Sequence, residues 1–186
     1  MIGYALTGSF CTIKRSLQIL DELLINNQIQ PIVSGTVANT DTRFGKAEDT
    51  LRYLSEKCGR APITTIAEAE PLGPRLPLDA LIICPCTGNT LAKMANGITD
   101  TSVTMAAKAH LRNQRPLILA IATNDGLSQS LSNIAVMLNK KNVYIVPFGQ
   151  DDPTGKPCSL ISDMSLVKAT LEQAMQGKQI QPILIR

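Results

Sequence analysis

The sequence predicts an α/β protein, with a Rossmann-like, doubly wound parallel sheet that carries helices on both faces. Two observations support this fold class. Short apolar runs alternate with segments whose apolar residues recur at helical spacing, as in chains built from strand–helix units. The runs at 80–84 and 117–122 are almost wholly apolar, as expected for strands covered on both faces. We find no internal repeat, and 186 residues suit one domain, so we expect a single domain over 1–186.

The predicted strands are short and apolar. They cover residues 2–6, 32–33, 63–66, 80–84, 117–122 and 143–146, and the run at 63–66 is the weakest of them. Pro85 should break the run at 80–84, because proline donates no hydrogen bond to a neighbouring strand. Pro71, Pro74 and Pro77 mark a loop, because proline does not fit a helix interior.

Helices are predicted where apolar side chains recur every three or four residues. They cover residues 13–24, 47–58, 127–138 and 165–176, with Gly59 and Gly177 as stops. Residues 147–160 form a long, turn-rich loop, and such loops are more often binding elements than spacers. The tail at 183–185 could add an edge strand or contact a neighbouring protomer, and the pattern leaves both alternatives open.

The composition argues against several classes of function. Aromatic residues make up 3% of the chain and Trp is absent, which disfavours single-stranded nucleic-acid binding by base stacking. The net charge of +3 comes from scattered basic residues, too mild a footprint for DNA or a membrane surface. The apolar runs fall far short of the roughly 20 residues that span a bilayer, and no signal peptide is recognised. Five cysteines without a disulfide pattern indicate free thiols in the reducing cytoplasm.

Two predicted strand ends carry small polar residues. Thr7-Gly8-Ser9-Phe10 follows the first strand directly before a helix, and Ser34-Gly35-Thr36 follows the second. Such turns can hold an anion on backbone N–H groups at a helix N-terminus. Neither the dinucleotide fingerprint nor a P-loop is present. Each turn alone could be an ordinary capped turn, but two on adjacent strands favour a phosphorylated ligand.

A third polar segment, at residues 85–100, reads PCTGNTLAKMANGITD. Small hydroxyl, amide and glycine residues fill the predicted strand–helix junction, then a helix follows, then a glycine turn that ends in Asp100. An ordinary loop does not need so much polar chemistry in so short a space. The residues alone therefore predict a ligand-binding segment without identifying the ligand.

This segment resembles the P-A-S-A-N-T-x-x-K-x-A-N-G-I-A-D signature of the flavoprotein decarboxylase family. That family includes phosphopantothenoylcysteine decarboxylase and the lantibiotic peptidyl-cysteine decarboxylases. The positions that match are Pro85, Asn89, Thr90, Lys93, Ala95, Asn96, Gly97, Ile98 and Asp100. The resemblance implies a Rossmann-like fold, bound FMN, and a homo-oligomer made of trimers with the flavin at the junction between protomers.

The resemblance also implies which residues contact FMN. Phosphate contacts would come from Gly8, Ser9, Phe10, Ser34 and Thr36, and Lys93 could offset phosphate charge or be an ordinary solvated lysine. Contacts to the ribityl chain and ring would come from Pro85, Cys86, Thr87, Asn89, Thr90, Asp100, Ser102 and Asn124. Asn124 resembles the asparagine of the family's P-x-M-N motif, although the flanking Pro and Met are missing. Asp100 could instead be a turn-forming residue.

One branch of the family is similar to the chain over nearly its whole length. The resemblance rests on GYALTGSFCT at the start, DTRFG at 41–45, CPCTGNT at 84–90 and PFGQDDP at 147–153. It implies a flavin-binding subunit that acts with an NADP-binding partner in the mother cell of a sporulating bacterium. Together they would oxidise a dihydrodipicolinate-type precursor to dipicolinate. Arg43, Lys156 and Ser159 are candidates to bind this dicarboxylate, since cations should converge on it; the alternative for each is an ordinary solvated side chain.

One departure from the family separates its branches. The decarboxylases carry an essential His after the second strand, whereas this chain has a single His, His110, on the helix after Asp100. We interpret His110 as a helix-surface or interface residue, so a decarboxylase of a cysteinyl substrate would lack its acid–base group. A non-catalytic partner protein is the other alternative, and we name no catalytic residue.

We also expect no metal site. Cys84 and Cys86 have no second pair at ligand spacing. Packing of small residues at the flavin edge explains them better, and Cys11 is interpreted as structural.

Overall fold

The computed structural model describes residues 1–73 and 75–185 and confirms the α/β fold class. Pro74 of the predicted proline loop and the last residue of the predicted domain lie outside the described residues. The strands are β1 (Ile2–Leu6), β2 (Ile29–Val33), β3 (Ala80–Cys86), β4 (Leu117–Thr123), β5 (Val143–Ile145), β6 (Phe148–Gly149) and β7 (Leu160–Ser162). Strands β2, β1, β3, β4 and β5 are neighbours in that order and run parallel.

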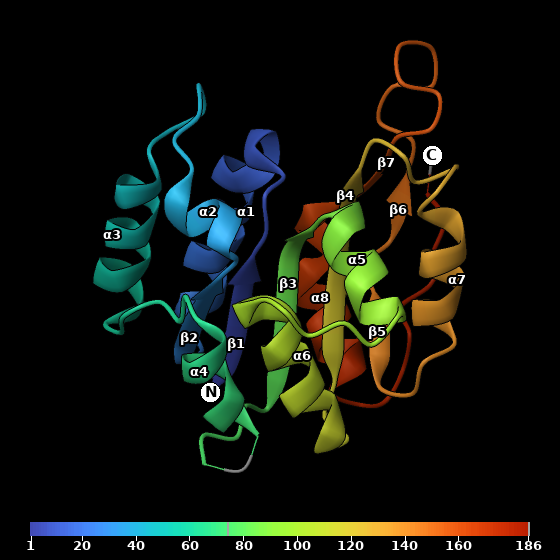
Figure 1. Ribbon diagram of the computed structural model, residues 1–186. Helices are drawn as coiled ribbons and strands as arrows, with labels where there is room; N and C mark the ends of the chain where they lie inside the picture. The colour runs from blue at the N-terminus through green and yellow to red at the C-terminus, as the bar shows by residue number, and fades with distance from the viewer. Residues whose placement is uncertain (74, 186) are drawn as a thin grey trace.

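Helices cover both faces of this sheet. They are α1 (Phe10–Leu24), α2 (Gly35–Asn39), α3 (Ala47–Cys58), α4 (Ile66–Ala69), α5 (Gly88–Ala95), α6 (Ser102–Arg112), α7 (Leu131–Leu138) and α8 (Val167–Ala174), with short 3₁₀ turns at Glu70–Leu72 and Met164–Leu166. In Figure 1, α5 and α6 lie in front of the strands and α8 lies behind them. No helix among the described residues is long and apolar enough to cross a membrane.

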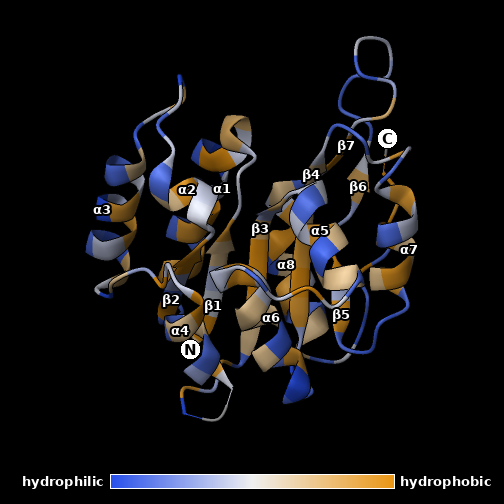
Figure 2. Cartoon of the chain, viewed as in Figure 1, coloured by the Kyte–Doolittle hydropathy of each residue, from blue (hydrophilic) through white to orange (hydrophobic). Residues whose placement is uncertain are grey.

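Alternation along the strands divides the core into two layers. Tyr4 and Leu6 of β1 point to the layer formed with α1, α3 and α8, whereas Ala5 belongs to the layer formed with α4 to α7. Successive strand residues face opposite sides of a sheet. Because helices cover both sides of this sheet, both sets of residues are buried. Figure 2 shows the result: apolar strands in the middle, and polar turns at both edges of the sheet.

The outer edge of β4 is shared by two strands of opposite direction. Leu117–Leu119 of β4 pairs with β5 in parallel, and Ala122–Thr123 pairs with β7 antiparallel. The tail then joins this corner, because the N–H of Phe148 donates to the carbonyl of Ile183 and the N–H of Ile185 donates to that of Phe148. The tail therefore pairs with β6 of its own chain, as the edge-strand alternative predicts. The antiparallel strands were not predicted.

Several predicted boundaries are wrong, including that of β2, which begins at Ile29 rather than Ile32. At 63–66 only Ile63 pairs, by one bridge to Ile32, because Thr65 and Glu68 form a capping box that starts α4. Strand β3 continues through Pro85 to Cys86, with a register shift against β4 after Ile83. Helix α7 begins at Leu131 rather than near Leu127.

A candidate ligand cleft at the carboxyl edge of the sheet

The first strand–helix turn leaves donors free for a ligand. Ser9 is the N-cap of α1, but its side chain makes no capping hydrogen bond. The first N–H groups of a helix have no acceptor within the helix, and the helix dipole is positive at this end. Thr12, one turn later, donates its hydroxyl to the Ser9 carbonyl at 2.8 Å. The Ser9 hydroxyl has only a weak contact, 4.0 Å from Cys11 Sγ. The turn thus combines a loosely held hydroxyl with an electropositive helix end, which suits an anion.

Thr7 couples this turn to the end of β3. Its side chain is buried, and its hydroxyl donates to the Pro85 carbonyl at 2.7 Å while accepting the Thr87 N–H at 3.0 Å. Thr87 in turn is the N-cap of α5, and its hydroxyl accepts the N–H of Thr90. One buried hydroxyl therefore fixes the ends of β1 and β3, and the starts of α1 and α5, relative to each other.

A cleft of about 230 Å³ opens between these helix starts and the loop before β7. Six of the predicted site residues line it: Gly8, Ser9, Thr87, Asn124, Lys156 and Ser159. The rest of the lining is Cys11, Thr12, Gly88, Ala122, Thr123, Asp151, Leu160 and Ile161. Residues from four separate parts of the chain thus meet, as expected where the carboxyl ends of parallel strands lie side by side.

Gly88 allows the loop after β4 to approach α5 closely. A Cβ atom on Gly88 would lie 2.5 Å from the Thr123 hydroxyl oxygen and 2.7 Å from that of Ser130. Asp125 organises this loop, because its carboxylate accepts hydrogen bonds from the hydroxyls of Thr123 and Ser130. These bonds, that of Thr123 first, lower the pKa of Asp125, so the carboxylate is charged at neutral pH.

The loop between β6 and β7 forms the other wall. Lys156 Nζ lies 3.4 Å from Asp151 Oδ2, and Ser159 is buried with its hydroxyl 3.3 Å from the Thr123 carbonyl. The Ser159 hydroxyl and then Lys156 lower the pKa of Asp151. In Figure 1 this loop rises from the same edge of the sheet as the α2–α3 loop, which contains Arg43.

Arg43 and Phe10 lie beside the cleft rather than in it. The Arg43 guanidinium stacks 4.8 Å above the Phe44 ring, and Phe10 lines a separate small hollow with Phe44. Ser34 is the buried N-cap of α2. Thr36 approaches Gly8, with 3.1 Å between its methyl carbon and a Cβ built on that glycine.

The remaining predicted residues lie outside the cleft lining. Lys93 Nζ is 2.9 Å from both carboxylate oxygens of Asp100, which ties α5 to the segment before α6. Ser102 is buried and donates to the Val33 carbonyl at 2.5 Å. Also outside the cleft lining are Pro85, Cys86, Asn89 and Thr90; Asn89 is exposed, and Cys86 is fully buried in the core, which raises the pKa of its thiol.

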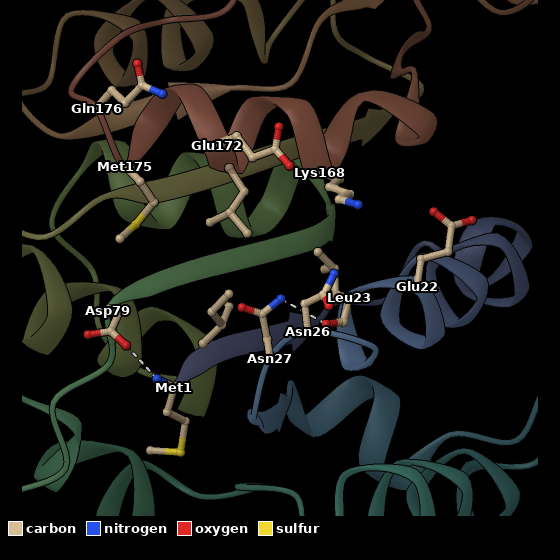
Figure 3. A pocket seen from close by; sticks show the side chains of 12 residues that line it. Met1, Glu22, Leu23, Asn26, Asn27, Asp79, Lys168, Glu172, Met175 and Gln176 are labelled. Atoms are coloured by element: carbon tan, nitrogen blue, oxygen red, sulfur yellow. Dashed lines mark hydrogen bonds and ion pairs between the residues drawn. The ribbon is translucent and has the colours of Figure 1, made fainter.

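A second cavity, of about 520 Å³, lies at the opposite, amino edge of the sheet (Figure 3). Its lining comes mainly from the last turns of α1 and α8 and includes Glu22, Asp79 and Glu172. Lys168 is the one side-chain cation in the described lining. We find no group of three metal-ligating His, Cys, Asp or Glu side chains within 1–73 and 75–185.

Comparison with known proteins assigns the chain to a family. The family model described as Flavoprotein matches residues 1–174. This chain belongs to the flavoprotein family. The dipicolinate synthase subunit designated B of Bacillus subtilis is 43% identical over 185 residues, which is 99% of this chain and 92% of the relative. The crystal structure of the dipicolinate synthase subunit designated B from Bacillus halodurans C is 40% identical with a TM-score of 0.91, covering 100% of this chain and 95% of the other.

A more distant protein of known structure shares the fold of this flavoprotein. The FMN-dependent cysteine decarboxylase SpaF has a TM-score of 0.65 at 19% identity, with 95% of each chain covered. At that identity the likeness shows the fold alone.

His110 of this flavoprotein is not a helix-surface residue, which corrects the interpretation from sequence. It is 1% exposed, and its Nε2 atom lies 2.8 Å from the Pro116 carbonyl oxygen, where β4 begins. Burial lowers the pKa of its imidazole. The single His therefore packs at the amino edge of the sheet, away from the cleft.

Sequence reasoning missed several residues that shape the cleft of this flavoprotein. Thr7, Gly88 and Asp151 are the clearest cases. A hydroxyl that ends a buried strand, and a glycine that opens a helix in PCTGNT, were available signals for the first two. Asp151 had a weaker signal, its place in the turn-rich loop that contains Lys156.

Proposed function

We propose that this flavoprotein is the FMN-binding subunit of a dipicolinate synthase. It would act with the other subunit of that enzyme, designated A, which would bind NADP. Together they would oxidise a dihydrodipicolinate-type precursor in the mother cell of a sporulating bacterium. The 43% identity to the Bacillus subtilis relative over nearly the whole chain is the observation that carries the proposal. The polar cleft at the carboxyl edge supports it, since ligands of open α/β sheets bind there.

The donors in the cleft fit the polar half of FMN. The first turn of α1 offers N–H groups and the Ser9 hydroxyl, which makes no capping hydrogen bond, and these groups match a phosphate. Gly8 has no side chain to cover them, and Thr36 lies directly beside it. The exposed Asn124 amide suits the hydroxyls of a ribityl chain, since it can donate and accept hydrogen bonds. The Thr87 hydroxyl donates to that of Thr90 and could only accept from such a chain.

A second copy of the chain would complete the site. The cleft of about 230 Å³ is smaller than the roughly 300–1,000 Å³ of sites that enclose a drug-sized ligand. A single chain therefore has room for part of FMN, and a neighbouring copy would cover the ring. This agrees with the trimer-based homo-oligomer that the family resemblance implies. Asn89, exposed at the start of α5, is available to such a neighbour.

The dicarboxylate would bind at the mouth of the same cleft. Lys156 supplies a cation there and Ser159 a hydroxyl, and Arg43 on the α2–α3 loop could close on the second carboxylate with its planar fork. Forming an aromatic ring from the precursor removes two electrons and two protons. FMN supplies two-electron redox chemistry when it is bound, and the chain itself would bind, orient and shield the ring.

A cysteinyl decarboxylase is a weaker candidate for this chain. His110, the single His of the sequence, is buried at the amino edge and contacts the Pro116 carbonyl. It cannot exchange protons with a substrate at the carboxyl edge. Release of CO₂ from a cysteinyl substrate by the purified protein would nevertheless revive that function.

The visible absorption spectrum of the purified protein, before and after addition of FMN, tests the proposal. Oxidised flavin has bands that no amino-acid side chain produces, and we expect them to co-elute with the protein. Adding the precursor without oxygen should then bleach the bands. No bound flavin at excess FMN would overturn the proposal and leave a protein that serves assembly only. Full synthase activity of the NADP-binding partner alone, with no gain on adding this chain, would point the same way.

A further inference from the structure

The only side-chain cation in the described lining of the cleft already has an anionic partner. Lys156 Nζ lies 3.4 Å from Asp151 Oδ2, and both side chains line the cleft together with Ser159. Lys156 remains half exposed, with 53% of its side chain accessible, so the pair stands at the mouth of the cleft rather than in the core. An incoming anion would meet the carboxylate and the ammonium together.

The loop that carries this pair is internally ordered. Asp152 Oδ1 accepts the Gly155 N–H at 2.8 Å, and the Asp152 carbonyl accepts the Lys156 N–H at 2.8 Å. Gln150 donates its side-chain amide to the Pro157 carbonyl at 2.8 Å. These bonds keep Asp151 and Lys156 on the cleft side of the loop without using either charged group. The ion pair is therefore not needed to shape the loop.

We propose that the Asp151 carboxylate is an internal stand-in for a carboxylate of the substrate. It occupies the cation that would bind that carboxylate, Lys156, and a dicarboxylate enters by displacing it. This inference rests on the proposed function, because it assigns the seat of one substrate carboxylate. Asp151 then sets the specificity of the cleft, since an anion must outcompete it to reach Lys156.

The energetics fit a stand-in that can be displaced. A partly exposed ion pair of this kind is worth about 0.2–1 kcal/mol, so Lys156 would be free in roughly 15–40% of molecules. The apparent affinity of a ligand that needs free Lys156 is therefore its intrinsic affinity multiplied by that fraction. Removing the Asp151 charge should therefore tighten dicarboxylate binding about two- to sixfold. A weak monoanion gains too little to displace Asp151, whereas a dicarboxylate gains a second contact elsewhere.

Calorimetric titration with pyridine-2,6-dicarboxylate tests this on the full-length protein with FMN added. We expect Asp151→Asn to bind the probe about two- to sixfold more tightly than the wild type, and Lys156→Gln to bind it at least about fivefold more weakly. Asp152→Asn is the matched control, with the same charge change one residue away. It keeps the Oδ1 acceptor for Gly155 and should stay within twofold of the wild type.

Three outcomes would overturn the inference. Asp151→Asn could bind the probe as the wild type does or more weakly, which would make Asp151 structural. Asp152→Asn could tighten binding equally, which would mean a general charge effect. The third outcome is that neither the wild type nor any variant binds the probe, which would remove the proposed carboxylate site at Lys156. Flavin absorbance of the same samples separates these results from the proposed function, because the inference can fail while FMN still binds.

Discussion

The two edges of the sheet each hold a cavity, and the larger one is the poorer anion site. The amino-edge cavity has about 520 Å³ and the carboxyl-edge cleft about 230 Å³. Yet the carboxyl ends of α1 and α8 point to the amino-edge cavity, whereas the amino ends of α1 and α5 lie at the carboxyl-edge cleft. Helix C-termini repel anions and N-termini attract them.

The comparison teaches that helix direction decides what a cavity can bind. In a parallel sheet each strand is followed by a helix that starts at the carboxyl edge, so the N–H groups of the helices gather there. The amino edge collects carbonyl groups and, in this chain, the carboxylates of Glu22 and Glu172 (Figure 3). Volume alone would have selected the wrong edge for a phosphorylated ligand.

The largest expected effect is on FMN affinity, when a negative charge is placed at the carboxyl edge rather than at the amino edge. Ser9→Asp should weaken FMN binding at least about 100-fold, because like charges about 4 Å apart repel by some 4 kcal/mol at an effective dielectric constant near 20. The fold should not suffer, since Asp is as good an N-cap as Ser. Asn26→Asp at the amino-edge cavity is the counterpart and should leave FMN affinity unchanged. Flavin absorbance titrations and thermal melts measure both; equal losses at the two edges would break the comparison.

Buried hydrogen bonds give the next effect. Thr7→Val removes a hydroxyl that serves both the Pro85 carbonyl and the Thr87 N–H, so the free energy of unfolding should fall by about 1–3 kcal/mol. His110→Phe at the amino edge should cost less, because the Pro116 carbonyl keeps the N–H of Leu81. Only Thr7→Val should also weaken FMN binding, since it releases Thr87. Urea unfolding and flavin titration are the measurements, and weaker FMN binding by the His110 variant would contradict the division between the edges.

From the sequence, the place of the candidate site at the carboxyl edge was easier to predict than the individual contacts within it. Periodicity and strand-end residues indicated the fold class and the meeting of Gly8, Ser9, Thr87 and Asn124, because topology brings strand ends together whatever the side chains do. Periodicity could not show that a local capping box at Thr65 would outcompete strand pairing at 63–66. Apolar spacing also placed the α7 start too early, at Leu127.

Pairings between distant residues were beyond the sequence. The Thr7 hydroxyl and Thr87 are 80 positions apart, and nothing in either segment signals their bond. Nothing in the sequence signals the contact of His110 with the Pro116 carbonyl either. His110 lies on a helix whose buried residues include Ala106 and Ala109. Lys93 and Asp100 were each matched to the flavin motif, yet they pair with each other seven positions apart.

The smallest expected effect concerns two carboxylates held by neutral donors. Hydroxyls lower the pKa of Asp125 at the carboxyl edge, and the N–H groups of Thr64 and then Thr65 lower that of Glu68 at α4. A carboxyl with a lowered folded-state pKa stabilises the fold above its unfolded pKa of roughly 4, and this stability is lost as the pH falls through the folded value. Asp125→Asn and Glu68→Gln should thus each cost at most about 1 kcal/mol at pH 7, since solvent screens both groups.

The two variants should differ in one respect. Below pH 3 both should approach the wild type in stability, as measured by urea unfolding across pH. At neutral pH only Asp125→Asn should change FMN affinity, tightening it by no more than about threefold, because it removes a negative charge beside Gly88 in the cleft wall. An equal change in Glu68→Gln would mean that net charge, rather than position at the carboxyl edge, governs binding of the anion.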